Sequence, residues 1–353
     1  SGTLTNVNQP ETGSAPMSTF VVTGAGGHVG ATLIRSLLKD GHTVRALDMD
    51  PGIALEGLSV EILTGDIRDA DFLRSAINAG DTLFHLASVI STSGDKGGLV
   101  PSVNVDGARN VAEVAAERGV KRMVHFSSIH AFDIDTHGAP VTEETRLATA
   151  NSRSAYNLSK ARGQEEVRKV IAEKGLDAVT VHPCGVIGPY DYKPSRMGKF
   201  FRGVAKGHNA RVGPAGFNWV DVRDVVAGAR LALEKGRTGE GYILGGHWVS
   251  NLDLGLMASK ITGQPVPDKP ISMWVLRALN VAGPLIKLMG QTPPINDEIL
   301  DALAANPDMS SDKAKQELGY SPRPTQQTVE DIFAWYEAED IIAQERARRK
   351  KAG

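Results

Sequence analysis

A glycine-rich segment between two apolar stretches constrains this chain most. Three glycines, spaced three residues apart, follow the apolar run 20–22 and precede the amphipathic segment 31–38. This order predicts a strand, a tight turn and a helix. A pyrophosphate can approach such a turn closely because glycine has no Cβ, and the helix that begins there directs free N–H groups at the phosphates. The residues that we expect to hold a dinucleotide here are Gly24, Gly27, His28, Val29 and Gly30. A turn that serves packing alone is the alternative.

The composition excludes several classes of protein. The 353 residues are 41% apolar and 23% charged, as in soluble globular proteins, and the formal net charge of -2 gives no basic surface for nucleic acid. Cys184 is the single cysteine, so the chain has no internal disulfide, and a cytoplasmic location is expected.

The apolar stretch 271–289 is interrupted by Arg277, Asn280 and Pro284, which predicts a helical hairpin or a lid. Peripheral contact with a membrane is not expected, although it is left open.

Short apolar runs alternate with helical patterns over the first half of the chain. The predicted strands after the glycine turn are 43–47, 60–63, 82–86, 122–126 and 178–181, and the clearest helices are 103–118 and 154–173. Such alternation is typical of an α/β protein with a doubly wound parallel sheet of the Rossmann type, in which ligands bind at the carboxyl ends of the strands.

The pattern becomes irregular after residue 183. Strands return at 219–222 and 242–244, and most of the remaining sequence is helical with proline-rich joints, one of them at Pro293-Pro294. We predict a disordered segment 1–17, a dinucleotide-binding domain of residues 18–183 with 219–249 partly interleaved, and a basic tail 344–353. The smaller, mostly helical substrate-binding domain is predicted to comprise 184–218 and 250–343.

Three more segments fit a cofactor at the carboxyl ends of the strands. Asp48 ends the second strand about twenty residues after the glycine turn, where a carboxylate accepts hydrogen bonds from a ribose diol and repels a 2′-phosphate. This favours NAD over NADP, although the nearby Arg45 leaves NADP open. Asp66 and Ile67 follow the third strand, where they suit an adenine. The small residues after the fourth strand, which let a cofactor approach the backbone, are Leu86, Ala87 and Ser88.

The strongest chemical signal is a tyrosine four residues before a lysine. Tyr156 and Lys160 share one face of the predicted helix, so the ammonium is expected near the phenol oxygen. A cation there lowers the pKa of the phenol, which then exchanges a proton with an alcohol or a ketone. Ser128, after the fifth strand, can hold the substrate oxygen.

Together these motifs resemble the extended, or atypical, short-chain dehydrogenase/reductase family. The likeness also covers the segments 103–107, 182–189, 218–225 and 312–320, and it is greatest to the branch of dihydroflavonol reductases and 3β-hydroxysteroid dehydrogenases. The resemblance implies a catalytic Ser128, Tyr156 and Lys160, with Asn104 supporting them and with Tyr156, Lys160, Pro183 and Val186 also contacting NAD. It further implies a small-molecule substrate and a homodimer.

The substrate pocket is predicted to be apolar. Family members that act on sugar nucleotides usually carry an arginine where this chain has Phe217, two residues before Trp219. With Phe132 and His130 also expected at the pocket, this favours an NAD(P)-dependent oxidoreductase whose substrate is an apolar secondary alcohol or ketone, for example a sterol-like or polycyclic one. A sugar-nucleotide epimerase or dehydratase without net redox change is the alternative, and a catalytically silent nucleotide-binding protein is a third. The histidines lack metal-ligand spacing, so no metal is expected.

Overall fold

The computed structural model describes residues 19–92, 94–134, 139–152, 154–208, 212–290, 295–297, 300 and 308–345. The predicted disorder of 1–17, the Pro293-Pro294 joint and all but the first two residues of the basic tail lie outside the described residues.

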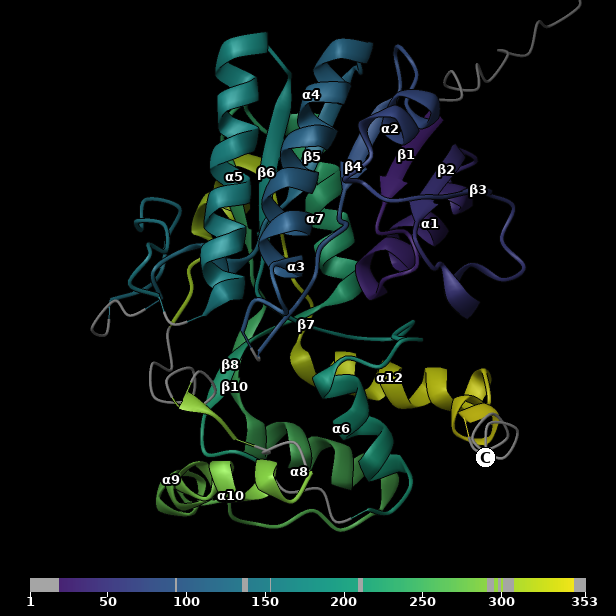
Figure 1. Cartoon of the computed structure of the whole chain (residues 1–353). Helices are drawn as coiled ribbons and strands as arrows, with labels where there is room; N and C mark the ends of the chain where they lie inside the picture. The colour runs from purple at the N-terminus through teal and green to yellow at the C-terminus, as the bar shows by residue number, and fades with distance from the viewer. Residues whose placement is uncertain are drawn as a thin grey trace, which may run out of the picture.

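A seven-stranded parallel sheet forms the centre of the fold (Figure 1). Its strands are β1 (Thr19–Thr23), β2 (Thr43–Asp48), β3 (Glu61–Thr64), β4 (Thr82–His85), β5 (Arg122–Phe126), β6 (Ala178–Pro183) and β9 (Gly241–Leu244). The order β3-β2-β1-β4-β5-β6-β9 reverses direction between β1 and β4, which pair in parallel with Thr23 opposite His85. This is the predicted doubly wound Rossmann-type sheet, and its reversal point is where such sheets bind ligands.

Helices cover both faces of the sheet. The helices α2 (Ala70–Ala76), α4 (Ala108–Arg118) and α5 (Ala155–Lys174) pack on one face, and α1 (His28–Lys39) and α7 (Val222–Lys235) pack on the other (Figure 1). The predicted helix 103–118 differs in detail, because it begins as a π-helical segment, Ser102–Gly107, after the single turn α3 (Leu99–Pro101). The helix α5 begins where the Ser154 hydroxyl accepts a hydrogen bond from Asn157 N, and it ends at Gly175, whose φ is positive.

A second region lies beyond the carboxyl edge of the sheet. It contains a small sheet of order β10-β8-β7, made of β7 (Gly185–Ile187), β8 (Gly216–Asp221) and β10 (His247–Ser250). Its helices are α6 (Arg196–Ala205), α8 (Asn251–Thr262), α9 (Met273–Val281), α10 (Gly283–Leu288) and α12 (Thr325–Ala338).

The chain passes back and forth between the two sheets. β8 pairs with β7 and β10, while β9, between β8 and β10 in sequence, pairs with β6 in the large sheet. The strand β10 was not predicted, and β8 begins three residues earlier than expected. A separate apolar core joins α6, α8 and α12 through Phe201, Leu254 and Val329. The domain boundaries given above stay a prediction.

Candidate active site

A cavity of about 1650 Å³ opens between the carboxyl edge of the large sheet and the second region. It extends from the glycine turn and Asp48, past Ser128 and Tyr156, to Phe217 on β8. The site residues predicted from the sequence that line it are Gly24, Gly27, His28, Val29, Gly30, Asp48, Asp66, Ile67, Leu86, Ala87, Ser88, Ser128, His130, Phe132, Tyr156, Lys160, Pro183, Val186, Phe217 and Trp219. The fold thus brings nearly all of the predicted residues to one place, with Asn104 as the exception.

The glycine turn has no space for side chains. Gly24 has a φ of +68°, and a Cβ there would lie 2.7 Å from the backbone N of Ala87. A Cβ on Gly30 would lie 2.3 Å from the carbonyl oxygen of Gly24. Because these contacts are far shorter than van der Waals distances, the turn requires glycine at both positions. The resulting cradle at the start of α1 fits the pyrophosphate of a dinucleotide.

Asp48 is held in place by the turn itself. Its carboxylate accepts hydrogen bonds from the backbone N of Gly26 at 2.8 Å and of Asp50 at 3.0 Å. Arg45, which left NADP open, instead forms ion pairs with Glu61 at 3.0 Å and with Asp81 at 2.9 Å. Since both of its partners are carboxylates, Arg45 is already neutralised, and the site favours a ribose without a 2′-phosphate.

The adenine end of the cavity contains an ion pair that was not predicted. Arg68 contacts the Asp66 carboxylate at 2.5 Å, and hydrogen bonding from Arg68 lowers the pKa of Asp66. Both side chains line the cavity, so Arg68 is an additional candidate for contact with the adenine or its ribose. The opposite charges two residues apart, on either side of Ile67, are the sequence signal that could have identified it.

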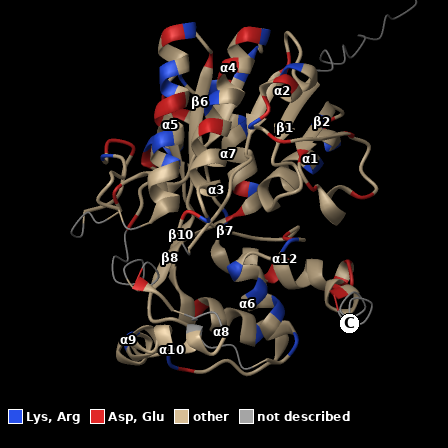
Figure 2. Cartoon of the chain, viewed as in Figure 1, with Lys and Arg blue, Asp and Glu red and all other residues tan. Residues whose placement is uncertain are grey.

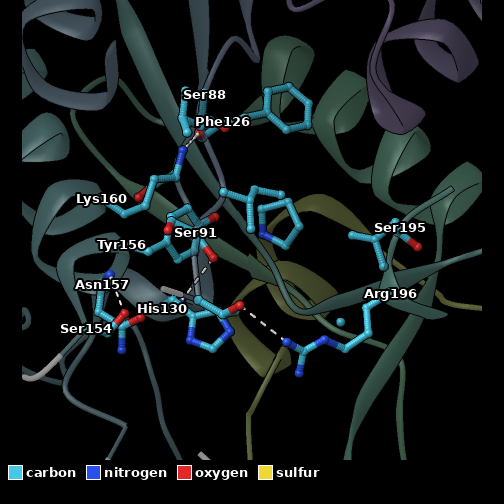
Figure 3. A pocket seen from close by; sticks show the side chains of 18 of the residues that line it. Ser88, Ser91, Phe126, His130, Ser154, Tyr156, Asn157, Lys160, Ser195 and Arg196 are labelled. Atoms are coloured by element: carbon cyan, nitrogen blue, oxygen red, sulfur yellow. Dashed lines mark hydrogen bonds between the residues drawn. The ribbon is translucent and has the colours of Figure 1, made fainter. Parts of the chain in front are cut away.

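Lys160 is placed differently from our expectation. Its side chain is buried, and its ammonium donates a hydrogen bond to the backbone carbonyl of Phe126 at 2.9 Å (Figure 3). Burial lowers the pKa of Lys160 to about 8. Burial also raises the pKa of Tyr156, and the opposing influence is a hydrogen bond with Ser128, not the ammonium. The structure thus places the ammonium on the Phe126 carbonyl, and the lowering of the tyrosine pKa by Lys160 stays a prediction.

Ser128 and its neighbour Ser127 have different partners. The Ser128 hydroxyl accepts a hydrogen bond from the backbone N of His130 at 3.2 Å and also interacts with Tyr156. The Ser127 hydroxyl instead donates to the Gln164 side chain at 2.9 Å. This supports the choice of Ser128 as the group next to the reacting oxygen.

Asn104 does not line the cavity. Its buried side-chain amide accepts a hydrogen bond from Val89 N at 2.7 Å and donates to Val89 O and to the Ser159 hydroxyl, both at 2.9 Å. It therefore ties the loop after β4 to α5. These contacts fit the supporting role that the resemblance implies for Asn104, because they join the loop and the helix that carry the site; the role itself stays a prediction.

Aromatic rings form a continuous row on the substrate side. The ring of His130 lies 5.9 Å from the ring of Tyr156 and is stacked on Phe217, also at 5.9 Å with 14° between the planes. Phe217 in turn lies 5.6 Å from Trp219. Burial lowers the pKa of His130 to about 4, so this ring is neutral at neutral pH. Phe132 is almost fully buried and packs on His182 at 4.7 Å, so it belongs mainly to the core.

A basic side chain and apolar side chains line the far side of the cavity. Arg196, from α6, lies across the cavity from Tyr156 (Figure 3). Ile271, just before α9, and Leu276, on α9, also line the cavity. Arg202, also on α6, is buried and donates a hydrogen bond to the carbonyl of Asp191. The residues that the structure describes contain no group of three or more His, Cys, Asp or Glu able to hold a metal ion, and no helix among them is long and apolar enough to cross a membrane.

Comparison with known proteins establishes the family. Residues 20–245 match the model of the NAD dependent epimerase/dehydratase family, and the chain belongs to this family. The family confirms NAD as the expected cofactor.

Individual relatives match over most of their length. Sterol demethylase protein B of Methylococcus capsulatus is 33% identical, with 92% of this chain and 100% of the relative covered. A putative dihydroflavonol 4-reductase of Synechocystis is 32% identical, with 90% and 94% covered. The crystal structure of gox2253 superposes with a TM-score of 0.79 at 35% identity and covers 91% of this chain and 98% of that one. These similarities confirm the resemblance to the dihydroflavonol reductase branch, whereas the homodimer that it implies stays a prediction.

Proposed function

We propose that this protein is an NAD-dependent dehydrogenase/reductase that interconverts an apolar secondary alcohol and the corresponding ketone. The observation that carries the proposal is the position of Ser128, Tyr156 and Lys160 in the same cavity as the glycine turn and Asp48. Bound NAD would accept or supply the hydride. The glycine cradle would hold its pyrophosphate and Asp48 its ribose diol, while the neighbourhood of Asp66 and Ile67 would hold its adenine.

Tyr156 is proposed to transfer the proton. Burial favours the neutral phenol, which is the form that would give a proton to the carbonyl oxygen during reduction. During oxidation the same group would act as the phenolate and remove the proton of the substrate hydroxyl. The Ser128 hydroxyl, already in contact with Tyr156, would donate a hydrogen bond to that oxygen. Lys160 would contribute a positive charge beneath the site and contact the cofactor ribose, since its pKa of about 8 leaves it protonated at neutral pH.

The walls of the cavity support an apolar substrate. The aromatic row from His130 to Trp219 borders the position of the reacting oxygen, and Phe217 stands where a cation would be needed for a sugar nucleotide. Aromatic faces bind flat, apolar molecules well because they remove a large area from water. The name of the relative from Methylococcus, a sterol demethylase protein, is consistent with a polycyclic substrate.

A sugar-nucleotide epimerase or dehydratase is the second candidate, and Arg196 is the observation that favours it. Three other cations at the cavity each pair with a carboxylate, namely Arg68 with Asp66, Arg146 with Asp133 and Lys193 with Asp50. Arg196 instead donates to the hydroxyl of Thr92 at 3.3 Å. It is therefore available to bind a diphosphate, or the carboxylate of an otherwise apolar substrate.

Cofactor absorbance distinguishes the two candidates. Purified protein is mixed with NADH or NAD and with a panel of apolar ketones, alcohols and sterols, beside a panel of sugar nucleotides. Net change in NADH absorbance with an apolar compound supports the proposal, and conversion of a sugar nucleotide without such a change refutes it. Tyr156→Phe is the matched variant, because it removes the phenol oxygen and keeps the ring.

A further inference from the structure

The helices α9 and α10 expose an unusual number of large apolar side chains. The apolar hairpin face consists of Trp274 (72% exposed), Leu279 (36%), Val281 (80%), Leu285 (63%), Leu288 (87%) and Met289 (70%). Charged residues are sparse on these two helices compared with α4 and α5 (Figure 2). An exposed apolar surface of this kind on a folded protein marks a binding site, because leaving it in water is unfavourable.

The same hairpin borders the substrate side of the cavity. Leu276 on α9 is buried and lines the cavity, as does Ile271 just before the helix. Trp274, two residues before Leu276, is exposed. The helix α9 therefore separates the interior of the cavity from the apolar hairpin face, and whatever covers that face lies next to the cavity.

The charge of the hairpin indicates the type of partner. Residues 271–290 include Arg277 and Lys287 but no Asp or Glu. Short helices that combine Trp and Leu with a few basic residues are typical of segments that lie in the interface of a bilayer. A second copy of this chain is a poorer partner, because a two-fold contact would bring together identical hairpins that have basic residues and no carboxylate of their own. The carboxylate that Asn280 of α9 contacts at 2.7 Å belongs to Asp297, in the segment that follows the hairpin.

We propose that the apolar hairpin face adsorbs to an anionic phospholipid surface, with α9 and α10 lying in the interface. Neither helix spans the bilayer, since the described residues contain no helix of sufficient length and apolarity. The adsorbed hairpin places the cavity beside the phase in which an apolar substrate dissolves. The delivery of substrate from lipid rests on the proposed function, whereas the adsorption itself does not.

Vesicle binding tests the adsorption without any turnover. Wild-type protein is sedimented with vesicles of phosphatidylcholine, with and without phosphatidylglycerol. We expect binding to the mixed vesicles that weakens with salt, and a loss of at least tenfold in partition coefficient for Leu285→Ser combined with Leu288→Ser. Ile62→Ser is the control, because Ile62 is 43% exposed on β3 at the other end of the molecule; its partition coefficient should equal that of the wild type.

Tryptophan fluorescence reports which surface meets the lipid. The emission of the wild type should shift to the blue on vesicle binding, and this shift should disappear in Trp274→Phe but persist in Trp248→Phe. Trp248, on β10, is 44% exposed and is therefore the matched reporter outside the hairpin. Circular dichroism checks that the double serine variant folds like the wild type. If that variant does not fold, the fluorescence of Trp274→Phe, which keeps an apolar ring, still tests the proposal.

Two results would overturn the proposal. One is equal sedimentation of wild type and double serine variant with mixed vesicles. The other is a dimer in light scattering that the double serine variant abolishes while vesicles capture neither protein, because the face would then bind a second copy. If only the proposed function is wrong, the protein would still bind vesicles, but no apolar substrate would change the NADH absorbance.

Discussion

Replacing Lys160 by methionine is expected to stabilise the protein while removing its activity. Burial shifts the pKa of Lys160 from 10.5 to about 8, and each unit corresponds to about 1.4 kcal/mol. The charged side chain thus costs the folded state about 3 kcal/mol at pH 7. Methionine has a similar length and no charge, but it leaves the Phe126 carbonyl without its donor, which costs about 1–2 kcal/mol. The expected net gain in free energy of unfolding is about 1–2 kcal/mol.

The pH dependence of this gain identifies its cause. Below about pH 8 the lysine is charged in both states, so the wild type bears the full penalty. Between about pH 8 and 10.5 the unfolded chain binds more protons than the folded protein, so the stability of the wild type rises with pH relative to the variant. The advantage of Lys160→Met should therefore be complete at pH 7 and absent above pH 10.5.

Urea unfolding at pH 7, 8, 9 and 10 measures the difference, with Lys169→Met as control. Lys169 lies on the same helix but is exposed and pairs with Glu166 at 2.6 Å, so its replacement should show no such dependence on pH. A Lys160→Met variant that is less stable than the wild type at pH 7, or whose difference is constant up to pH 10, would refute the reasoning. Turnover and NAD binding by the same variant show whether the buried charge serves the site.

Three further changes test other parts of the site. Asp48→Asn should raise KM for NAD about tenfold and reduce the preference over NADP, because it removes the charge that meets the ribose diol; an unchanged ratio of the two KM values would argue against this role. Phe217→Ala should lower kcat/KM about tenfold for a large apolar ketone, and Phe217→Leu should recover much of it, whereas equal loss with a small ketone would contradict a contact specific to the larger substrate. Acid should destabilise the protein between pH 6.5 and about 4, because burial lowers the pKa of His85 and His182 to about 3 and that of His125 well below 6.5. These three histidines and His130, whose pKa burial lowers to about 4, bind protons on unfolding, so the free energy of unfolding should fall by up to about 5 kcal/mol per pH unit, and a flat profile in urea titrations would contradict their neutral burial.

The parts of the fold that depend on local patterns were predictable from the sequence. The glycine turn, the strands of the Rossmann-type sheet and the helix that carries Tyr156 and Lys160 each follow from spacing within about twenty residues. Asp48 could be placed for the same reason, because it ends the strand that follows the first helix.

Features that depend on distant partners were not predictable. β10 is four residues long and is defined by its pairing with β8. The position of the Lys160 ammonium depends on the Phe126 carbonyl, which is thirty-four residues earlier in the chain. Asn104 likewise has its partners at Val89 and Ser159, so its positioning role is apparent only when both are in place.

The most direct test of the proposed function is the absorbance of NADH with apolar ketones, compared between the wild type and Tyr156→Phe. The structure predicts net oxidation of NADH by the wild type, a preference for NADH over NADPH, and a fall of about 10²–10⁴-fold in kcat for Tyr156→Phe with folding and cofactor binding retained. Unchanged turnover in Tyr156→Phe, or conversion of sugar nucleotides alone without net change in the cofactor, would contradict the account.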